Sequence, residues 1–373
     1  MHACPPLSRR ALLVGASQIA AVTLARASTA PVTLSALDQF SLVRSGGRWW
    51  LVGELVVAAA GEKPVALREL RAVTGDMASP LCVLPADALR AAGATRQGRP
   101  LERAIVAAGD TATLFLWHAI DGAPPTGPGV QLRLVTDAGE ATLEVPLQRP
   151  TVLQPPLRGG PWVAVYDPLF PFGHRRSAFE RDGRRHIPAR FAVDWIRLDA
   201  SGRPAPDGAG FDRWFGLGAD VFAVADATVA AARDGAPDVL ETLRPAGRWA
   251  PEEVAGNFVC LDIGGGRFVF YEHLKRGSVR VSAGQAVKAG EGIGQVGRSG
   301  VNSSGPHLHF HVADGQSLLH AQGRPWSLEG FHQLGDYPGM AAAESGRPWR
   351  PAAAAAGGGA PALPPPNGVL QFG

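Results

Sequence analysis

The segment at residues 305–312 reads Gly-Pro-His-Leu-His-Phe-His-Val, so histidines alternate strictly with large apolar residues. Successive side chains of a β-strand point to opposite faces of its sheet, and this alternation therefore predicts a strand. One face would carry the apolar side chains into a core, and the other would carry the imidazoles of His307, His309 and His311. A row of imidazoles gives a sheet little apolar burial, so metal ligation or acid–base catalysis explains it better than a solvated polar face.

Two further apolar stretches each end in a chemically versatile side chain. Residues 268–274 (Phe-Val-Phe-Tyr-Glu-His-Leu) place His273 at the end of a predicted strand, although a lone histidine is more often structural. Residues 190–195 (Arg-Phe-Ala-Val-Asp-Trp) place Asp194 on the face opposite to the apolar side chains. Because an unpaired buried carboxylate is costly, Asp194 needs a partner, either a cation or an arginine side chain.

The rest of the chain favours a mostly β protein with two domains. A length of 373 residues exceeds one ordinary domain, and 47 glycines with 32 prolines suit short strands joined by tight turns. We expect an immunoglobulin-like β-sandwich at residues 28–155, in which residues 130–135 alternate as a half-buried strand. A second strand-rich block follows at 156–335. The Pro/Ala/Gly-rich segment 336–373 has few large apolar residues, so we expect a disordered tail there.

The first 27 residues predict an export signal. The pair Arg9-Arg10 precedes an apolar stretch that runs to about residue 25, and Ala25-Arg26-Ala27 gives a small-x-small cleavage site. This arrangement resembles a twin-arginine signal. The apolar stretch is too short and diluted for a membrane span, so we expect none after signal removal. The exported protein would lie in the periplasm or the cell envelope.

The charge balance argues against a nucleic-acid partner. The formal net charge is +3, but removal of the signal would take away three arginines and leave basic residues equal in number to the 33 acidic ones. No long basic run then remains to neutralise phosphates. Cys82 and Cys260 would remain in different domains, which predicts two buried thiols and no disulfide framework. We expect a monomer.

An ordered set of motifs resembles the lysostaphin/LytM-type zinc endopeptidases, which hydrolyse bacterial peptidoglycan. The resemblance covers roughly residues 160–320, and the ordered set is highly specific although each motif is weak alone. The motifs are Gly-Asn-Phe-Val at 256–259, Tyr-Glu-His-Leu at 271–274, the turn at 285–294, Gly-Arg-Ser-Gly at 297–300 and Gly-Pro-His-Leu-His-Phe at 305–310, with a hairpin-like stretch at 220–229 before them.

This resemblance implies an antiparallel β-sheet domain of the duplicated hybrid motif type, with a narrow groove over one sheet and one Zn²⁺ ion. Carried over position by position, Asp194 and His309 would bind zinc, while His307 and His273 would be catalytic. Two imidazoles and one carboxylate leave a fourth tetrahedral position open for water, the pattern of a catalytic zinc site. We expect His307 to act as the base and His273 to stabilise the oxyanion, with the exchanged roles left open. The expected substrate is the peptide stems of peptidoglycan.

The first zinc ligand departs from the family pattern. The family places it four residues before the aspartate, as His-x-x-x-Asp, where this chain has Arg190, which cannot ligate. His174 and His186 are the two candidates, and the insertion before Asp194 could fold back as a hairpin. We favour His174, because it follows an apolar, Pro/Gly-punctuated entry that looks like the end of a strand.

His311 stands where the family often has glutamate, and we expect it to support the metal ligands or to line the groove. If neither His174 nor His186 reached the metal, the site would be degenerate and the chain would be a wall-binding or regulatory module of the family. Against this alternative stand His273 and His307, which a pure binding module does not need. A requirement for a regulatory protein partner, and the role of the N-terminal domain, stay open.

Overall fold

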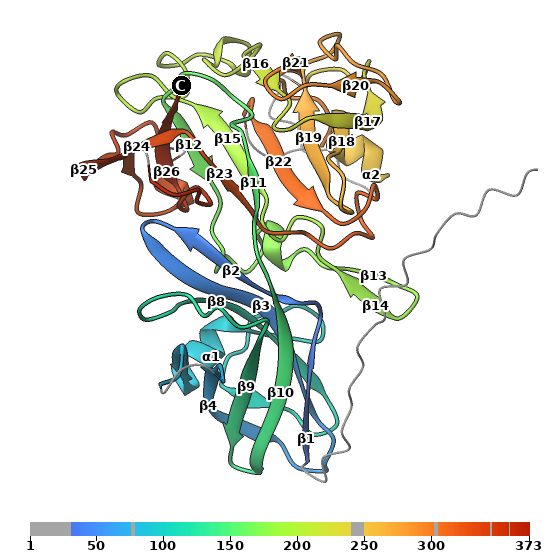
Figure 1. Cartoon of the computed structure of the whole chain (residues 1–373), viewed down its shortest axis with the longest axis vertical. Helices are drawn as coiled ribbons and strands as arrows, with labels where there is room; N and C mark the ends of the chain where they lie inside the picture. The colour runs from blue at the N-terminus through green and yellow to red at the C-terminus, as the bar shows by residue number, and fades with distance from the viewer. Residues whose placement is uncertain (1–30, 76–78, 240–249, 302–304, 344, 358) are drawn as a thin grey trace, which may run out of the picture.

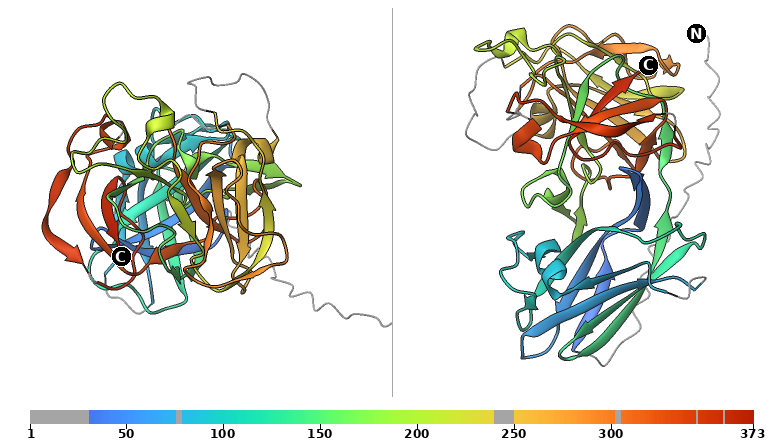
Figure 2. Two further views of the ribbon diagram at one scale, coloured as in Figure 1. Left: turned by 90° about the horizontal axis from the view of Figure 1, so that it is seen from above. Right: turned by 90° about the vertical axis from the view of Figure 1, so that its left-hand side faces the viewer.

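The computed structural model describes residues 31–75, 79–239, 250–301, 305–343, 345–357 and 359–373. Two β-rich halves are arranged end to end, the N-terminal half from blue to green and the C-terminal half from green to red (Figure 1), and Figure 2 shows the same arrangement from the side. The mostly β fold predicted from the sequence is confirmed. No helix in the described ranges is long and apolar enough to cross a membrane. The predicted signal at residues 1–27 lies outside the described residues.

The N-terminal half is built on a ten-stranded sheet with the order β5-β4-β9-β10-β2-β3-β8-β6, to which β1 adds at β3 and β7 at β4. The strands pair antiparallel, except that β10 and β2 run parallel. The elements are β1 (Val32–Ala36), β2 (Phe40–Ser45), β3 (Arg48–Ala59), β4 (Val65–Val73), β5 (Cys82–Pro85), α1 (Ala86–Ala92), β6 (Gly93–Thr95), β7 (Ile105–Val106), β8 (Thr111–Ala119), β9 (Gly129–Thr136) and β10 (Gly139–Gln148).

Alternate side chains of these strands fill an apolar core, and β9 is a clear example. Val130, Leu132 and Leu134 are fully buried, whereas Gln131 and Arg133 turn toward solvent. This pattern confirms the predicted half-buried strand. The immunoglobulin-like topology of this half stays a prediction.

The C-terminal half is built on a second ten-stranded sheet, antiparallel throughout, with the order β20-β17-β18-β19-β22-β15-β12-β26-β24-β25. Its strands are β12 (Trp162–Val165), β15 (Val193–Arg197), β17 (Ala227–Arg233), β18 (Asn257–Asp262), β19 (Phe268–Leu274), β20 (Ala286–Val287), β22 (Leu308–Ala313), β24 (Phe331–Asp336), β25 (Arg350–Gly357) and β26 (Gly368–Phe372).

Three short ribbons and four short helical segments complete this half. The ribbons pair β11 (Thr151–Leu153) with β23 (Trp326–Leu328), β13 (Phe179–Arg181) with β14 (Arg184–His186), and β16 (Asp220–Phe222) with β21 (Gly292–Gln295). The helical segments are the 3₁₀ turns η1 (His174–Arg176) and η2 (Phe211–Arg213) and the helices α2 (Pro251–Ala255) and α3 (Met340–Ala343). The β13–β14 ribbon is the hairpin that the sequence suggested for the insertion before Asp194.

The expected disordered tail at residues 336–373 is corrected by the structure. Strand β26 pairs with β12 inside the sheet, and β24 and β25 continue the sheet beyond it. Leu363, Val369, Leu370 and Phe372 are buried. The Ala/Gly-rich stretch suggested a segment without a core, but these few large apolar side chains bury fully because they enter a core that the preceding domain has already built.

The two halves share an apolar core. Trp117 of β8 lies with its ring centroid 6.2 Å from the ring of Tyr166 and 6.1 Å from that of Phe191, both in the C-terminal half. Val43 and Val52 of the N-terminal half belong to the same buried cluster. Because the core runs across the boundary, the halves pack directly against each other.

Candidate metal centre

Three neighbouring strands bring polar side chains onto one face of the C-terminal sheet. In the order β19-β22-β15, His309 of β22 lies between Glu272 of β19 and Asp194 of β15, directly opposite each in the antiparallel register. Residues directly opposite in an antiparallel pair share a face of the sheet. The alternation that buries Leu308 and Phe310 on the core side therefore gathers these three polar side chains on the other side.

Asp194 is the centre of the cluster. Its Oδ1 lies 2.9 Å from Nδ1 of His309 and 3.6 Å from Nε2 of His307. Its Oδ2 lies 3.5 Å from Nε2 of His174, whose ring centroid stands 4.7 Å from that of His309. The carboxylate that needed a partner thus has three imidazoles around it.

His174 reaches the cluster from a loop that follows β12. The last residue of β12, Val165, pairs with Asp194, and eight residues then lead to His174 at the start of η1. His186 ends β14 and has its ring centroid 6.1 Å from that of His320. Among the described residues, the donor groups close enough to share one ion include His174 but not His186.

His273 and His307 stand side by side next to the cluster, with ring centroids 4.9 Å apart. Nδ1 of His273 lies 2.9 Å from the carbonyl oxygen of Ser299, and Nδ1 of His307 lies 2.8 Å from that of Gly305. A carbonyl oxygen only accepts, so both rings carry their proton on Nδ1 when neutral. Each Nε2 is then left with a free lone pair.

Two glycines of the motifs fix the position of the Ser299 carbonyl. Gly256 and Gly300 both have positive φ, and a Cβ on Gly256 would lie 2.5 Å from the backbone of Ser299. The two segments can therefore approach closely only without side chains at these places. Asn257, next to Gly256, accepts a hydrogen bond on Oδ1 from the backbone N–H of Ala236 at 2.8 Å. Its Nδ2 donates to the Leu274 carbonyl at 3.0 Å, which fixes the end of β19 beside His273.

Electrostatics keep the rings of His174 and His273 neutral beside an ionised carboxylate. Burial opposes ionisation of Asp194, but the neighbouring imidazoles, His174 first, outweigh it and hold the pKa of the carboxyl well below its ordinary value. Desolvation lowers the pKa of His174 to about 4 and lowers that of His273 well below its ordinary value. Burial also lowers the pKa of His309, but the carboxylates of Glu272 and Asp194 outweigh it, so the net shift is upward.

A second set of side chains lies at Nε2 of His309, the ring nitrogen that does not face Asp194. Nε2 of His309 lies 3.1 Å from Nδ1 of His311, and Oε1 of Glu272 lies 3.7 Å from the same Nδ1. The His311 ring stacks on Phe270, with centroids 4.6 Å apart and planes 7° from parallel. His311 thus contacts a predicted ligand. The sequence reasoning overlooked Glu272, although a lone carboxylate in an apolar strand is the signal that singled out Asp194.

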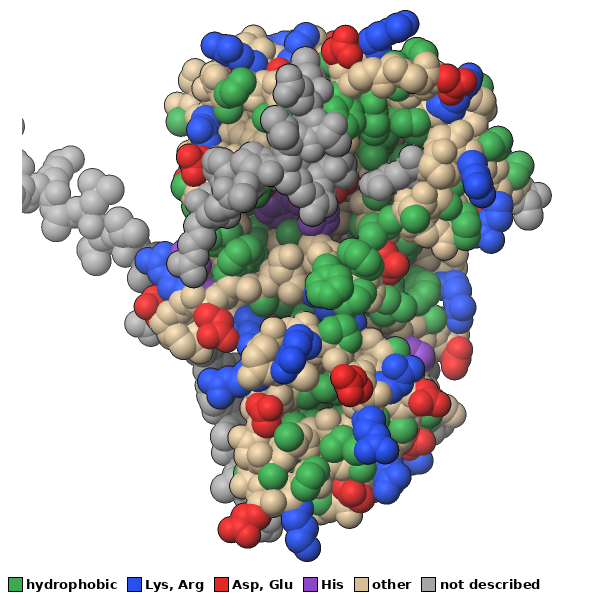
Figure 3. Space-filling model, turned by 180° about the vertical axis from the view of Figure 1, so that it is seen from behind, with side chains coloured by type: hydrophobic (Ala, Val, Ile, Leu, Met, Phe, Trp, Pro, Cys, Tyr) green, Lys and Arg blue, Asp and Glu red, His purple; other side chains and the backbone are tan. Residues whose placement is uncertain are grey.

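The donor set of His174, Asp194 and His309 fits a small divalent cation. All three donor atoms lie within 4.8 Å of one another. Zinc bonds to histidine nitrogen and carboxylate oxygen are about 2.0–2.2 Å long, so donors around one tetrahedral ion stand about 3.4 Å apart. The separations of 2.9 and 3.5 Å are close to this value. The His174 side chain is 36% exposed, and histidines are visible on the face shown in Figure 3.

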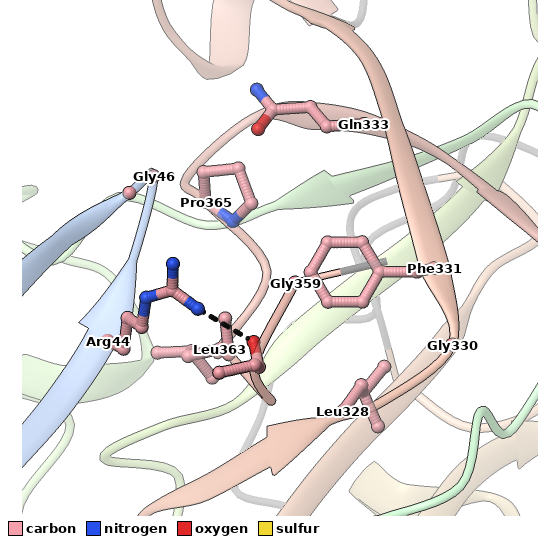
Figure 4. A pocket seen from close by; sticks show the side chains of 12 residues that line it. Arg44, Gly46, Leu328, Gly330, Phe331, Gln333, Gly359, Leu363 and Pro365 are labelled. Carbon is pink, nitrogen blue, oxygen red and sulfur yellow. Dashed lines mark hydrogen bonds between the residues drawn. The ribbon is translucent and has the colours of Figure 1, made fainter. Parts of the chain in front are cut away.

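A cavity of about 290 Å³ lies elsewhere, where the β2–β3 hairpin meets the C-terminal segment (Figure 4). In its wall, Nη1 of Arg44 donates a hydrogen bond to the Ala360 carbonyl at 2.9 Å. None of the five candidate site residues lines it. The cavity is mostly apolar and glycine-lined, and it is separate from the histidine cluster.

Residues 209–320 match the model of peptidase family M23. The matched range contains His273, His307 and His309, whereas His174 and Asp194 precede it, in the part of the chain where the first ligand departs from the family pattern. The matched range is therefore of the M23 peptidase type. The chain carries a domain of peptidase family M23, which confirms the lysostaphin/LytM-type resemblance.

Several solved structures are similar to this chain. The catalytic domain of the prophage-encoded M23 protein EnpA from Enterococcus faecalis, in a mutant form, is 19% identical, with 46% of this chain and 92% of that chain covered and a TM-score of 0.27. The catalytic domain of lysostaphin from Staphylococcus simulans is 21% identical, with 45% and 88% covered and a TM-score of 0.24. Pseudoalterin, an M23 metalloprotease from the deep sea, is 14% identical, with 57% and 96% covered and a TM-score of 0.28.

Proposed function

We propose that the chain is a zinc-dependent endopeptidase that hydrolyses peptide cross-links of bacterial peptidoglycan after export to the periplasm or cell envelope. The observation that carries this proposal is the meeting of His174, Asp194 and His309 in one cluster, with two further imidazoles beside it. The M23 match and the order of the motifs support the reaction class. The substrate and the export route rest on the family resemblance and on the N-terminal segment.

In this proposal His174, Asp194 and His309 hold one Zn²⁺ ion. When bound, zinc supplies Lewis acidity that lowers the pKa of water and polarises a peptide carbonyl. Three protein donors leave one tetrahedral position free, as in catalytic zinc sites. The neutral state of His174 and the ionised state of Asp194 suit ligation, because a ligand must be deprotonated to bind a metal.

His307 is the better placed of the two other histidines to act as the base. Its Nδ1 proton is held by the Gly305 carbonyl, so Nε2 is free to accept a proton from the attacking water. Asp194 lies 3.6 Å from this Nε2 and stabilises the imidazolium that results. The Nδ1 of His273 is held by the neutral carbonyl of Ser299 in the same way, so the nearby carboxylate of Asp194 is what favours His307.

We assign His273 to the oxyanion and the leaving amine. Burial keeps its ring neutral at rest, so Nε2 must gain a proton before it can donate one, and the proton that His307 takes from the attacking water supplies it. Once protonated, the ring donates to the oxyanion or to the leaving amine. The ring centroids of His273 and His307 lie 4.9 Å apart, which supports a shared action on one peptide bond.

The test combines metal analysis with digestion of purified peptidoglycan sacculi by the chain from residue 28 onward. We expect about one zinc per chain and new free peptide ends. The His307→Ala variant should keep its zinc and lose roughly 10²–10⁴-fold in rate, the usual contribution of a general base. Stoichiometric zinc and tight binding to sacculi without new peptide ends would contradict the proposal and favour a wall-binding or regulatory module.

A further inference from the structure

The residue after His174 points away from the metal centre and into the N-terminal half. The Arg175 side chain is 3% exposed. Its Nη2 donates to the backbone carbonyls of Gly53 on β3 and Leu116 on β8, at 3.1 and 2.6 Å, and to Oε1 of Glu54 at 3.1 Å. The start of η1 is therefore tied to two strands of the other half.

One carboxylate binds both segments that present candidate metal ligands. Glu54 projects from β3 and is 1% exposed. Its Oε1 accepts from Arg175, directly after His174, and its Oε2 accepts from Nε of Arg190 at 2.8 Å. Arg190 lies four residues before Asp194. Both ligand-bearing segments are thus held by the same side chain of the N-terminal half.

Arg190 is fully engaged in this contact. Its Nη1 donates to the Gly323 carbonyl and its Nη2 to Oε1 of Gln322, each at 2.8 Å. Its Nη1 also lies 3.4 Å from Oδ2 of Asp38 in the N-terminal half. Arg190 occupies the place where the family carries its first ligand, and here that place serves the contact between the halves. The side chain at the family's ligand position and the loop that carries His174 are therefore held by the same carboxylate, that of Glu54.

The charges of this contact are buried and depend on each other. Desolvation lowers the pKa of the Arg175 guanidinium to about 10, and the attraction of Glu54 opposes this shift. The guanidinium also lies 5.6 Å from the ring of Trp117. Without the Glu54 carboxylate, the buried Arg175 guanidinium would lose its ion-pair partner, and Arg190 would keep only Asp38 at 3.4 Å. A movement of the His174 loop away from β3 would separate the Arg175 guanidinium from the Glu54 carboxylate.

We propose that Glu54, acting through Arg175 and Arg190, fixes the segments that carry His174 and Asp194 and thereby sets the affinity of the site for its metal. This inference rests on the proposed metal site. Glu54 and Arg175 are positioning residues, since neither touches the metal donors. The N-terminal half is then a part of the metal centre's support, and not a separate module.

The test measures zinc affinity in the full chain by competition with a chromogenic chelator. Glu54→Gln keeps the shape of the side chain and removes its charge, and we expect zinc binding about 10–100-fold weaker, the usual effect of losing an outer support of a ligand. Arg175→Met should weaken zinc binding in the same direction. The double variant, which removes one cation and one anion, should bind no more weakly than the worse single variant, because the two residues share one interaction.

Two controls separate positioning from general loss of stability. Glu69→Gln removes a carboxylate that pairs with Arg71 at the surface of β4 and should leave zinc affinity unchanged. Leu132→Ala makes a cavity in the N-terminal core, so it should lower the melting temperature and leave the zinc affinity of the folded chain unchanged. Amide exchange of residues 173–177 and 187–193, measured without zinc, should be faster in Glu54→Gln than in either control variant.

If Glu54→Gln binds zinc as tightly as the unaltered chain and exchanges these amides at the same rate, the proposal is overturned. Equal weakening of zinc binding by Leu132→Ala would overturn it as well, because the effect would then follow stability alone. A chain that binds zinc but cuts no sacculi contradicts only the proposed function, since neither readout here depends on cleavage.

Discussion

The first ligand is the residue on which the composition of the metal centre depends. His174 lies 3.5 Å from Asp194, whereas His186 packs against His320 at the end of a separate ribbon. We therefore expect His174→Ala to lose stoichiometric zinc and His186→Ala to keep it. Metal content after gel filtration measures both variants. Zinc retained by the first variant and lost by the second would reverse the assignment.

The protonation of His309 gives zinc binding a pH dependence. Burial lowers its pKa, but Glu272 and Asp194 outweigh burial and raise the pKa above its ordinary value of about 6.5. This ring must lose its proton to ligate, so apparent zinc affinity should fall about tenfold per pH unit below the raised pKa and level off above it. Asp194 and His174, with lowered pKa values, add no slope near neutral pH.

Competition titrations between about pH 5 and pH 9 measure this dependence. A flat profile across the acidic side of that range would contradict it. Replacement of Glu272 by Gln removes a carboxylate that raises the pKa of His309, so the fall in affinity should begin at lower pH in this variant. If the surface control Glu69→Gln moved the pH at which zinc affinity begins to fall by the same amount, the contact between Glu272 and His309 would not be the cause.

At the scale of elements, strand β26 stabilises the sheet that carries Asp194. The Phe372 ring is 2% exposed and lies edge-on to Trp195, with centroids 5.4 Å apart. We expect Phe372→Ala to lower the free energy of unfolding by about 3–5 kcal/mol, as is usual for a buried phenylalanine. Urea unfolding measures the change. Gln371→Ala, on the less buried side of the strand, is the matched control and should change stability by no more than about 0.5 kcal/mol.

Strands in which polar and apolar residues alternate were predictable from the sequence. The gathering of histidines and Asp194 on these strands was predictable as well. The alternation at 305–312 defined β22, and the polar residues Asp194 and His273 in apolar runs identified its neighbours β15 and β19. Strand β26 was not predictable in this way, because its residues follow a long Ala/Gly-rich stretch and their burial depends on β12, about 200 residues earlier.

The contact between the halves was equally hidden from the sequence. Glu54 lies in the apolar strand β3, and nothing in its local pattern names Arg175 or Arg190 as partners. The pairing spans more than 120 residues of chain and depends on the docking of two sheets. The position of Arg190 in place of the family ligand was visible, but its use was not, because a missing ligand does not reveal what the replacing side chain binds.

At the scale of the whole molecule, the shared core couples the stability of the two halves. Val43, Val52 and Trp117 are buried in the same cluster as the core of the C-terminal sheet. We therefore expect one cooperative unfolding transition, with coincident midpoints by far-UV circular dichroism and by tryptophan fluorescence. Trp117→Ala should shift both probes together. Two separated transitions would contradict the coupling.

The anchoring of two ligand-bearing segments by one glutamate also limits how such proteins can be recombined. A chimera that joins this peptidase half to a foreign β domain would lose the acceptor for both arginines, whatever the quality of the new linker. A successful graft must supply an acid at the equivalent of position 54, or replace Arg175 and Arg190 together with uncharged residues. Fusion of domains at this boundary would therefore give a stable protein only when the two domains provide matching charges at these three positions.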